Sequence, residues 1–595
     1  MTERDVPGTL CEAFRATVTR FPEEVALRTP GGAVTLTWRK YAGRVREIAA
    51  GLARLGVGRG DTVALMMTNR PEFHVVDTAA FHLGAVPFSI YNTFAPEQIT
   101  HVLSNAGCRV AVGEEQFAGR LLAARDGTAV EHVVCVDGRP DGTVTLEEVV
   151  AGGDRAFGFE ACWRAVQPGD VLTLIYTSGT TGPPKGVEIT HAQVLADLAA
   201  LNQLMQSSAG DRGISCQPMA HITERLFAHY NAMLAAGQAT AVADLKDVPG
   251  ALLDVRPTIF GGVPRIWEKL KAVIEAIVAY EPDRAEQQAM QQAFDIARQH
   301  ARAAQVGHVP AELAEAYRQA DAQVLAKIRS ALGLDQVRIA GSGGAPIAPE
   351  ILEFMLALGI PVSEMWGMSE CLVGTANPPG AIRIGTVGKP IPGVELKLAG
   401  DGELLVRGPT VMKGYHNDPV QTAQAIDPAG WLHTGDIAAI DDDGYVRIID
   451  RKKELIINAA GKNMSPANIE NSVLAASPLI AQVVAIGDRR PYVVALIVLD
   501  PDAAAAFAAH HGASDISAAA LAAHPAIHAA VDTAVNAGNG KLSRVEQIKR
   551  FTILPAFWEP GGDEITPTMK LKRRLIAAKY AEVIDAMYAT AAQPG

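Results

Sequence analysis

Hydrophobic and polar positions follow two different periods along roughly the first two thirds of the chain. Short apolar runs at Asp61–Met67, Ala85–Ile90 and Val171–Tyr176 are bounded by polar residues, as in buried strands. Between them apolar residues recur at helical spacing, for example over 45–55, where Gly56 ends the pattern. Because strand and helix patterns keep alternating, the sequence predicts an α/β fold with largely parallel sheets.

The pattern changes twice further along the chain. Residues 275–332 are rich in Ala, Gln, Glu and Arg and poor in Gly, which predicts a long helical excursion. After Pro390 short β-like runs follow, at 394–398, 402–407, 437–440 and 445–449. The charged run Arg451–Glu454 then separates two apolar segments and is a candidate hinge. Beyond it, runs at 482–486 and 493–498 predict strands, and the Ala-rich region 503–534 predicts helix.

Length and composition limit the domain organisation and the classes of function. A chain of 595 residues exceeds the roughly 250–300 residues that one core supports. We therefore expect a large N-terminal body, residues 1–449, and a smaller C-terminal domain, residues 450–595. A hydrophobic content of 48% and a charged content of 20% are ordinary for a globular enzyme. The net charge of −12 gives no general attraction for nucleic acid, so local positive groups must capture any phosphate-bearing ligand.

Cysteine spacing and hydropathy predict where the protein works. Six cysteines lie far apart with no Cys-x-x-Cys pair, which favours reduced, mostly buried thiols over zinc ligands or disulfides. The segment Met1–Gly8 carries acidic residues and has no apolar core, unlike a signal peptide. No apolar run reaches the roughly 18 residues needed to span a bilayer. We expect a soluble, cytoplasmic protein; peripheral membrane contact and a homodimer stay open.

The segment Tyr176–Gly186 is the most informative part of the sequence. It contains three glycines, four Ser or Thr hydroxyls and one lysine, directly after a predicted strand. A flexible loop of this kind lets backbone N–H groups and hydroxyls converge on phosphate oxygens, while lysine supplies charge. It is not a Walker A loop, because prolines precede Lys185 and glycine follows it. The alternative is a disordered Gly/Ser/Thr linker.

This segment resembles the phosphate loop of the adenylate-forming superfamily, which includes acyl-CoA synthetases, peptide adenylation domains and firefly-type luciferases. The resemblance implies a body with two α/β sheet subdomains plus a β-rich subdomain, followed by a small, mobile α+β C-terminal domain. It also implies that the ATP phosphates are held by Thr177, Ser178, Gly179, Thr180, Thr181, Gly182 and Lys185.

Two further segments resemble the family's adenine and magnesium elements. Gly341–Ile347 follows a strand-like run and is similar to the segment that lines the adenine pocket, which implies contacts from Gly343, Gly344, Ala345 and Pro346. Glu364–Glu370 is similar to the family's Tyr-Gly-x-Thr-Glu element and implies roles for Trp366, Gly367, Ser369 and Glu370. By that resemblance Trp366 stacks on adenine, Ser369 contacts phosphate and Glu370 serves Mg²⁺. Taken without the family, the glycines form a tight turn, Trp366 is a core aromatic and Glu370 is a solvated acid.

Four elements nearer the C-terminus complete the resemblance. Asp436, in a Thr-Gly-Asp element, and Arg451 would hold the ribose hydroxyls, while Lys453 would be the hinge. Gly461 aligns with the loop that meets the pantetheine arm of CoA, although an ordinary turn glycine is an equal alternative. Lys570, in the Thr566–Lys570 motif, would bridge the substrate carboxylate and the α-phosphate. Taken without the family, Asp436 is an aspartate that caps a turn, and the charged run with Arg451 and Lys453 is solvated surface.

Two segments indicate a branch within the superfamily. Gln217–Arg225 resembles the Pro-Leu-Ala-His-x-x-Glu-Arg element of long-chain fatty acyl-CoA synthetases, which places His221 beside the carboxylate. Residues 256–269 resemble a segment shared by the long-chain and bubblegum-type enzymes. Without the family, His221 is a satisfied core histidine.

The resemblance implies an ATP-dependent long-chain fatty acid–CoA ligase that works through an acyl-adenylate. ATP, Mg²⁺ and CoA would be its cofactors and co-substrates, with Lys570, His221 and Glu370 as catalytic residues. Three alternatives stay open: a fatty acyl-AMP ligase that loads an acyl carrier protein, a luciferase-type oxygenase, and a nucleotide-binding pseudoenzyme. The sequence leaves the acyl chain length and the role of residues 275–332 open.

Overall fold

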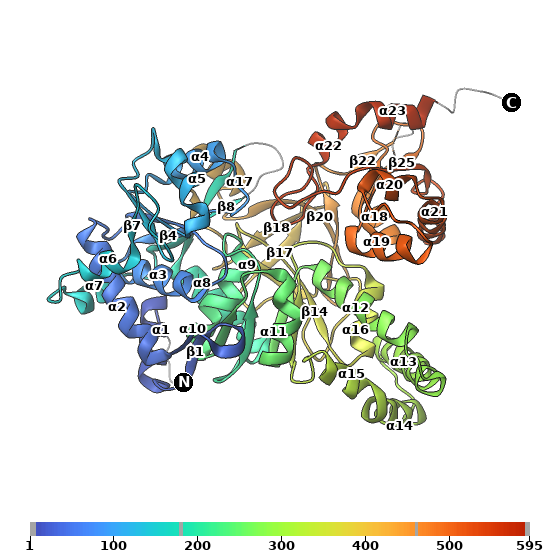
Figure 1. Ribbon diagram of the computed structural model, residues 1–595, viewed down its shortest axis with the longest axis horizontal. Helices are drawn as coiled ribbons and strands as arrows, with labels where there is room; N and C mark the ends of the chain where they lie inside the picture. The colour runs from blue at the N-terminus through green and yellow to red at the C-terminus, as the bar shows by residue number, and fades with distance from the viewer. Residues whose placement is uncertain (1–6, 178–182, 459–461, 590–595) are drawn as a thin grey trace.

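The computed structural model describes residues 7–177, 183–458 and 462–589. Figure 1 shows a large body that runs from blue to yellow and a smaller C-terminal domain in orange and red. The predicted mixed α/β class is confirmed, with several sheets separated by helical layers.

The first layer is an eight-stranded sheet in the order β19-β9-β8-β4-β3-β5-β6-β7. Its central strands β3 (Thr62–Met66), β4 (Val86–Ser89) and β8 (Val171–Thr177) coincide with the three predicted strands. The neighbours β4–β3, β3–β5, β5–β6, β6–β7 and β4–β8 are parallel. β9 (Lys185–Thr190) and β19 (Gly414–Tyr415) add an antiparallel edge. The remaining members are β5 (Val110–Gly113), β6 (His132–Cys135) and β7 (Val144–Thr145).

Helices pack against this sheet at the predicted positions. α3 (Pro71–His82) is buried at every residue except Glu72, and α2 (Trp38–Arg54) begins earlier than the predicted 45–55. The earlier start has a local cause, because the Thr37 hydroxyl accepts a hydrogen bond from the Lys40 N–H and caps the helix. The other helices of this layer are α4 (Pro96–Ala106), α5 (Glu115–Arg125) and α8 (His191–Met205).

The second layer consists of two sheets that meet where β10 (Arg212–Ser215) lies beside β12 (Ile259–Gly262). One sheet has the order β10-β11-β1-β2, with β11 (Gln238–Ala241), β1 (Val25–Arg28) and β2 (Thr35–Thr37). The other has the order β12-β13-β14-β15-β16, with β13 (Ile339–Ser342), β14 (Val362–Met368), β15 (Leu372–Ala376) and β16 (Lys389–Pro390). The ends of β13 and β14 carry the glycine-rich and Trp366 motifs.

The helical excursion predicted for 275–332 is confirmed. It consists of the end of α12 (Pro264–Ala279), then α13 (Arg284–Gln305), α14 (Ala311–Ala320), the π-helical η5 (Asp321–Leu325) and α15 (Ala326–Ala331). α13 packs against α16 (Pro349–Ala357), and Figure 1 shows α13 and α14 projecting at one edge of the body.

An antiparallel sheet β17-β18-β20-β21 forms the β-rich part that was predicted after Pro390. Its strands are β17 (Glu395–Leu398), β18 (Glu403–Arg407), β20 (Leu432–Ile440) and β21 (Val446–Arg451). The C-terminal domain is built on β24 (Ile480–Ile486), β25 (Val493–Leu499) and β26 (Ile548–Ile553), with α18 (Pro466–Leu474) beside β24.

The helical character predicted for 503–534 is confirmed, but the region is divided into separate helices. The region holds three helices, α19 (Pro501–His510), α20 (Ala518–Ala523) and α21 (Pro525–Asn539). Gly512 adopts a left-handed φ of 81° after the first helix, and Pro525 starts the third. Alanine propensity alone therefore does not override these two residues.

The buried apolar side chains form several separate hydrophobic cores, as expected for a chain of this length. Five of the six cysteines are buried, and Cys162 is partly buried. No helix within the described ranges is long and apolar enough to cross a membrane.

Candidate active site

A cavity of about 2050 Å³ extends from the body to the C-terminal domain. It gathers fourteen of the residues singled out in the sequence: Thr177, His221, Gly343, Gly344, Ala345, Pro346, Trp366, Gly367, Ser369, Glu370, Asp436, Arg451, Lys453 and Lys570. Lys185 does not line it. Ser178, Gly179, Thr180, Thr181, Gly182 and Gly461 lie outside the described residues.

Asp436 sits at the centre of a hydrogen-bonded cluster. It lies opposite Arg451 in the β20–β21 ladder, with 2.7 Å between its Oδ1 and the arginine Nε. Its Oδ2 accepts a 2.8 Å hydrogen bond from the Trp366 indole N–H. Burial raises the pKa of Asp436, and the positive charge of Arg451 opposes that rise. The strand geometry thus fixes a carboxylate on the cavity wall with two neighbouring donors.

Trp366 is only 8% exposed and belongs to a hydrophobic core cluster as well as to the cavity wall. Gly374 makes room for its ring: a Cβ at that glycine would approach the ring to 2.6 Å. The main polar contact of Trp366 is Asp436, so adenine stacking stays a prediction.

Glu370 faces a tyrosine that the sequence reasoning missed. The Tyr415 hydroxyl donates a 2.9 Å hydrogen bond to Glu370 Oε1, and the Lys185 ammonium lies 5.0 Å from the centre of the Tyr415 ring. Lys185 also donates to the Gln421 side chain at 2.9 Å. Lys185 is thereby connected to the cavity through Tyr415, although it does not line the cavity itself. No motif spacing marked Tyr415, because it reaches Glu370 from the edge strand β19.

Lys570 is presented by a closed turn. The Thr566 N–H donates to the Lys570 carbonyl at 2.8 Å, and the Lys570 N–H donates to the Thr566 hydroxyl at 3.0 Å. Between them Met569 adopts a φ of 65°, which is uncommon for a residue with a side chain. The threonine at the start of the motif therefore has a structural reason, since it closes the turn that carries the lysine.

The ammonium of Lys570 lies among charges from both parts of the protein. Its side chain keeps an exposed surface inside the cleft, yet the surrounding protein atoms displace enough water to lower its pKa. The nearby positive charge of Arg451 lowers this pKa further, whereas Asp436, Glu370 and Glu454 oppose the change. The C-terminal turn thus places a cation where the carboxylates of the body converge.

His221 lines the cavity as the N-cap of the short helix α9 (Ile222–Glu224). Its Nδ1 accepts from the Thr223 N–H at 3.3 Å, which leaves Nε2 as the donor. Burial, with a smaller effect of the Lys570 charge, lowers the pKa of His221 to about 4, so the ring is neutral near pH 7. Burial also raises the pKa of Glu224 to about 7, although hydrogen bonds from its surroundings oppose that rise. The Ser215 hydroxyl is one of the donors that oppose the rise. The Asn69 amide also donates to Glu224 Oε1, at 3.3 Å.

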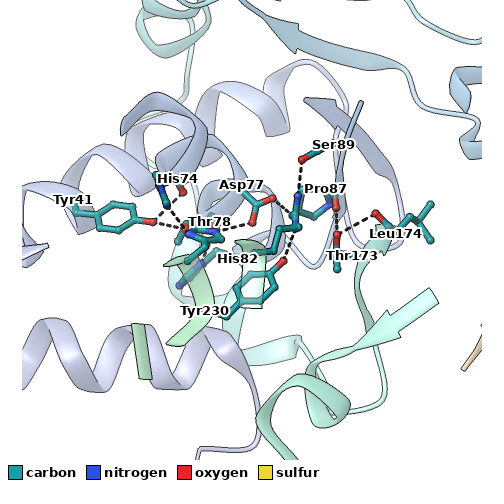
Figure 2. A network of polar contacts seen from close by, with 12 residues as sticks. Tyr41, His74, Asp77, Thr78, His82, Pro87, Ser89, Thr173, Leu174 and Tyr230 are labelled. Atoms are coloured by element: carbon teal, nitrogen blue, oxygen red, sulfur yellow. Dashed lines mark hydrogen bonds and ion pairs between the residues drawn. The ribbon is translucent and has the colours of Figure 1, made fainter. Parts of the chain in front are cut away.

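A fully buried polar network begins one residue later and was also missed by the sequence reasoning (Figure 2). The Arg225 guanidinium pairs with Asp77 of α3, and both side chains are 0% exposed. Arg225 also donates to the Ser89 hydroxyl at 2.8 Å and to the Tyr230 hydroxyl at 3.1 Å. The second Asp77 oxygen accepts from His229 Nε2 at 2.9 Å. The network ties α3 to the π-helical segment η3 (Arg225–Tyr230), which follows the His221 turn.

Two ion pairs join helices α12 and α16 of the body to the C-terminal domain. Arg265 at the start of α12 pairs with Asp500, and the Lys541 ammonium lies 2.5 Å from Glu350. Arg573, which follows the Lys570 motif, pairs within the C-terminal part with Glu470 and Glu454. Its partners lie more than 100 residues away in sequence, so the run Lys572–Arg574 gave no sign of them.

Comparison with known protein families agrees with this arrangement. The AMP-binding enzyme family matches residues 14–416, and the AMP-binding enzyme C-terminal domain matches residues 453–592. The chain belongs to the AMP-binding enzyme family. The recognition of an adenylate-forming enzyme from its motifs is therefore confirmed.

Several known proteins resemble most or nearly all of the chain. A protein of Mycobacterium tuberculosis named as a fatty-acid–CoA ligase, fadD11, is 54% identical over 460 residues, which cover 77% of this chain and 80% of that protein. The long-chain-fatty-acid–CoA ligase FadD15 of Mycobacterium bovis is 35% identical over 566 residues, 93% of this chain and 92% of its own. The crystal structure of the anthranilate CoA ligase AuaEII in complex with anthranoyl-AMP has a TM-score of 0.74 at 18% identity, covers 98% of this chain and 100% of that chain, and shows the same fold.

The magnesium expected for this AMP-binding enzyme fits Glu370 in chemistry. Within the described ranges no group of three or more His, Cys, Asp or Glu side chains forms a metal cluster of its own. Magnesium at nucleotide sites commonly uses one or two carboxylates together with substrate phosphates and water, so a dedicated cluster is not required. Glu370 supplies a nearly buried carboxylate whose Oε1 is oriented by Tyr415.

Proposed function

We propose that the protein is an ATP-dependent, AMP-forming long-chain fatty acid–CoA ligase. The observation that carries this proposal is the position of Lys570, which enters the cavity from the C-terminal turn beside Asp436 and Glu370. The fatty-acid–CoA ligase names of relatives at 54% and 35% identity support the choice of an acid and a thiol as substrates.

In the first half-reaction a fatty carboxylate oxygen attacks the α-phosphorus of ATP. A bond forms between carboxylate and phosphorus, the bond to the bridging oxygen breaks, and pyrophosphate leaves. Two anions must approach each other in this step, so an ammonium at their meeting point stabilises the transition state. We assign that role to Lys570, with the neutral His221 as a hydrogen-bond donor beside the carboxylate.

The nucleotide contacts are assigned by the same proposal. Thr177, Ser178–Gly182 and Lys185 hold the phosphates, the segment Gly343–Pro346 and the Trp366–Ser369 turn contact adenine and phosphate, and Asp436 with Arg451 holds the ribose. A carboxylate suits the ribose because it accepts two hydroxyl donors with charge assistance. Glu370 would hold Mg²⁺, which when bound supplies positive charge to the phosphate oxygens.

In the second half-reaction the CoA thiol attacks the acyl carbonyl, the thioester forms and AMP leaves with the electron pair of the broken bond. We propose that residues 450–595 form the mobile domain and rotate about Lys453, so that Lys570 leaves and Gly461 meets the pantetheine arm. Such alternation lets one site accept two different chemistries in turn. We propose in addition that the protein works in the cytoplasm and has no nucleic-acid partner.

The experiment is AMP release by the purified protein with Mg·ATP and fatty acids from short to very long, with and without CoA. The proposal predicts CoA-dependent acyl-CoA formation that is greatest with long chains. Pyrophosphate release that CoA does not change would instead support loading of a carrier protein. No release with any acid would contradict ligase function, and ATP binding would then identify a pseudoenzyme.

A further inference from the structure

Part of the cavity lining comes from elements that carry none of the predicted nucleotide residues; we call this part the acyl arm. Its walls come from α8, β10, η3 with the following helix α10 (Asn231–Ala235), and β11. Most of their lining residues are apolar or small, such as Leu198, Leu201 and Met205 on α8 and Phe227 and Ala228 on η3, with Asn202, Asn231 and Gln238 as polar members. A wall of this composition suits an alkyl chain.

The sheet side of the acyl arm is formed by two very small residues that face each other. Gly213 of β10 is the direct partner of Ala239 in β11. Because side chains alternate along a strand, both positions lie on the same face of the sheet. Ala239 belongs to the core cluster that also contains Leu198 and Leu201, whereas Ile214 belongs to a separate cluster on the other face. The Gly213–Ala239 pair therefore lies on the face of the sheet that belongs to the cluster with Leu198 and Leu201, and these residues line the same cavity.

Gly213 lies well away from the reacting end. β10 ends at Ser215, whose hydroxyl accepts from the Asn69 amide at 2.9 Å beside Glu224. Along an extended strand Gly213 is about 7 Å further back, at roughly 3.3 Å per residue. An alkyl chain whose carboxylate lies at His221 must extend past this distance before its carbons meet Gly213.

The surrounding backbone has room for a larger side chain at Gly213, but such a side chain would occupy the space of a long ligand. A Cβ there would lie 3.9 Å from the carbonyl oxygens of Gln238 and Ile259, which is ordinary contact. Its φ is not among the positive values, so the conformation does not require glycine. The absence of a side chain at this position thus leaves open space rather than relieving strain.

We propose that Gly213, opposite Ala239, determines how long an acyl chain the protein accepts. The alkyl chain passes between this pair and α8, and the missing side chain is what keeps the passage open. The inference rests on the proposed ligase function and adds to it the residue that sets chain length.

The test is a graded series, Gly213→Ala, Gly213→Val and Gly213→Leu, assayed for acyl-CoA formation with acids from hexanoate to stearate. The readout is the ratio of kcat/KM for long acids to that for short acids. We expect the ratio to fall stepwise with side-chain size, by about tenfold or more for leucine, as methylene-scale pocket changes do. Gly119→Leu, at an exposed helical position with open space around it, is the matched control and should keep the wild-type ratio.

A folded Gly213→Leu protein with the wild-type ratio, or with equal loss for every acid, would overturn the inference. If the leucine variant does not fold, the alanine variant decides, because its Cβ makes only ordinary contacts. An inactive wild-type protein would contradict the ligase function itself, and an active wild type with an unchanged variant profile would contradict only the role of Gly213.

Discussion

Two sets of ion pairs in this molecule differ most in their exposure to water. Behind the acyl arm, Arg225 and Asp77 are 0% exposed and are surrounded by further donors and acceptors (Figure 2). Between the body and the C-terminal domain, the side chains of Lys541 and Glu350 remain 47% and 46% exposed, whereas those of Arg265 and Asp500 are 24% and 12% exposed. The Arg225–Asp77 pair cannot separate without leaving a bare charge in the core, whereas water can replace the partners of the Lys541–Glu350 pair.

The difference matches what each region must do in the proposed reaction. A buried pair that loses one partner costs roughly 3–5 kcal/mol, whereas exposed pairs contribute about 0.2–1 kcal/mol. The acyl side can therefore stay fixed through both half-reactions, and the domain contact can break between them. The following predictions are ordered from the largest expected effect to the smallest.

Replacing Arg225 should have the largest effect on stability. Arg225→Leu leaves Asp77 buried without its main counter-charge, so we expect a loss of about 3–5 kcal/mol. Thermal unfolding of the purified variant checks this through the first transition. The double variant Asp77→Leu/Arg225→Leu is the matched control and should recover part of the loss, because it leaves no unpaired charge between the two positions. A single variant as stable as the wild type would remove the contrast between the two regions.

Lys570→Ala should separate the two half-reactions. Without the ammonium we expect pyrophosphate exchange to fall by about two to three orders of magnitude, as for loss of one transition-state donor. Thioester formation from supplied acyl-AMP should be spared, because Lys570 leaves the site before that step. Lys549→Ala, an exposed lysine on β26, is the control. Equal loss of both half-reactions would contradict the assigned role.

Glu224 should make the stability of the protein depend on pH between about 4.5 and about 7. Because the pKa of Glu224 is raised from about 4.5 to about 7, the folded state keeps a proton that the unfolded state releases in this window. Stability must then fall as pH rises from about 4.5 to about 7, by a few kcal/mol at most. Glu224→Gln cannot ionise, so its thermal midpoint should gain on the wild type across this window and not above it. If the thermal midpoints of the wild type and of Glu224→Gln changed with pH in parallel, the pKa of Glu224 would not be raised and the prediction would be wrong.

Lys541→Ala should have the smallest effect. Its pair with Glu350 is half exposed, so the stability change should stay below about 1 kcal/mol. We expect pyrophosphate exchange to fall by less than about fivefold and thioester formation to be unchanged or faster, because the adenylating arrangement loses one contact. Rates of the two half-reactions measured side by side check this. A large loss of stability would mean that the domain contact is permanent.

The sequence predicted local features well because their causes are local. The strands at 62–66, 86–89 and 171–177 follow from apolar periodicity, and the motifs around Trp366, Asp436 and Lys570 do lie together in one cavity. Their order along the chain could be compared with a family, which made the fold predictable as well.

The features that the sequence missed depend on partners far apart in the chain. Arg225 and Asp77 are 148 residues apart, and Tyr415 reaches Glu370 across 45 residues. No local period marks such pairs, and a charged residue in an apolar motif is equally compatible with a surface position. The break in the alanine-rich region had a local signal, Gly512 and Pro525, which helix propensity outweighed in the prediction.

Hydrogen exchange measured by mass spectrometry tests the contrast between the two regions most directly. Protection would be measured in the presence of Mg·ATP and a long-chain fatty acid, and measured again after CoA is added. The account predicts changed protection in peptides covering Lys541 and Thr566–Arg574, with none in peptides covering Asp77 and Arg225–Tyr230. Changed protection around Asp77 and Arg225, or unchanged protection throughout the C-terminal domain, would contradict it.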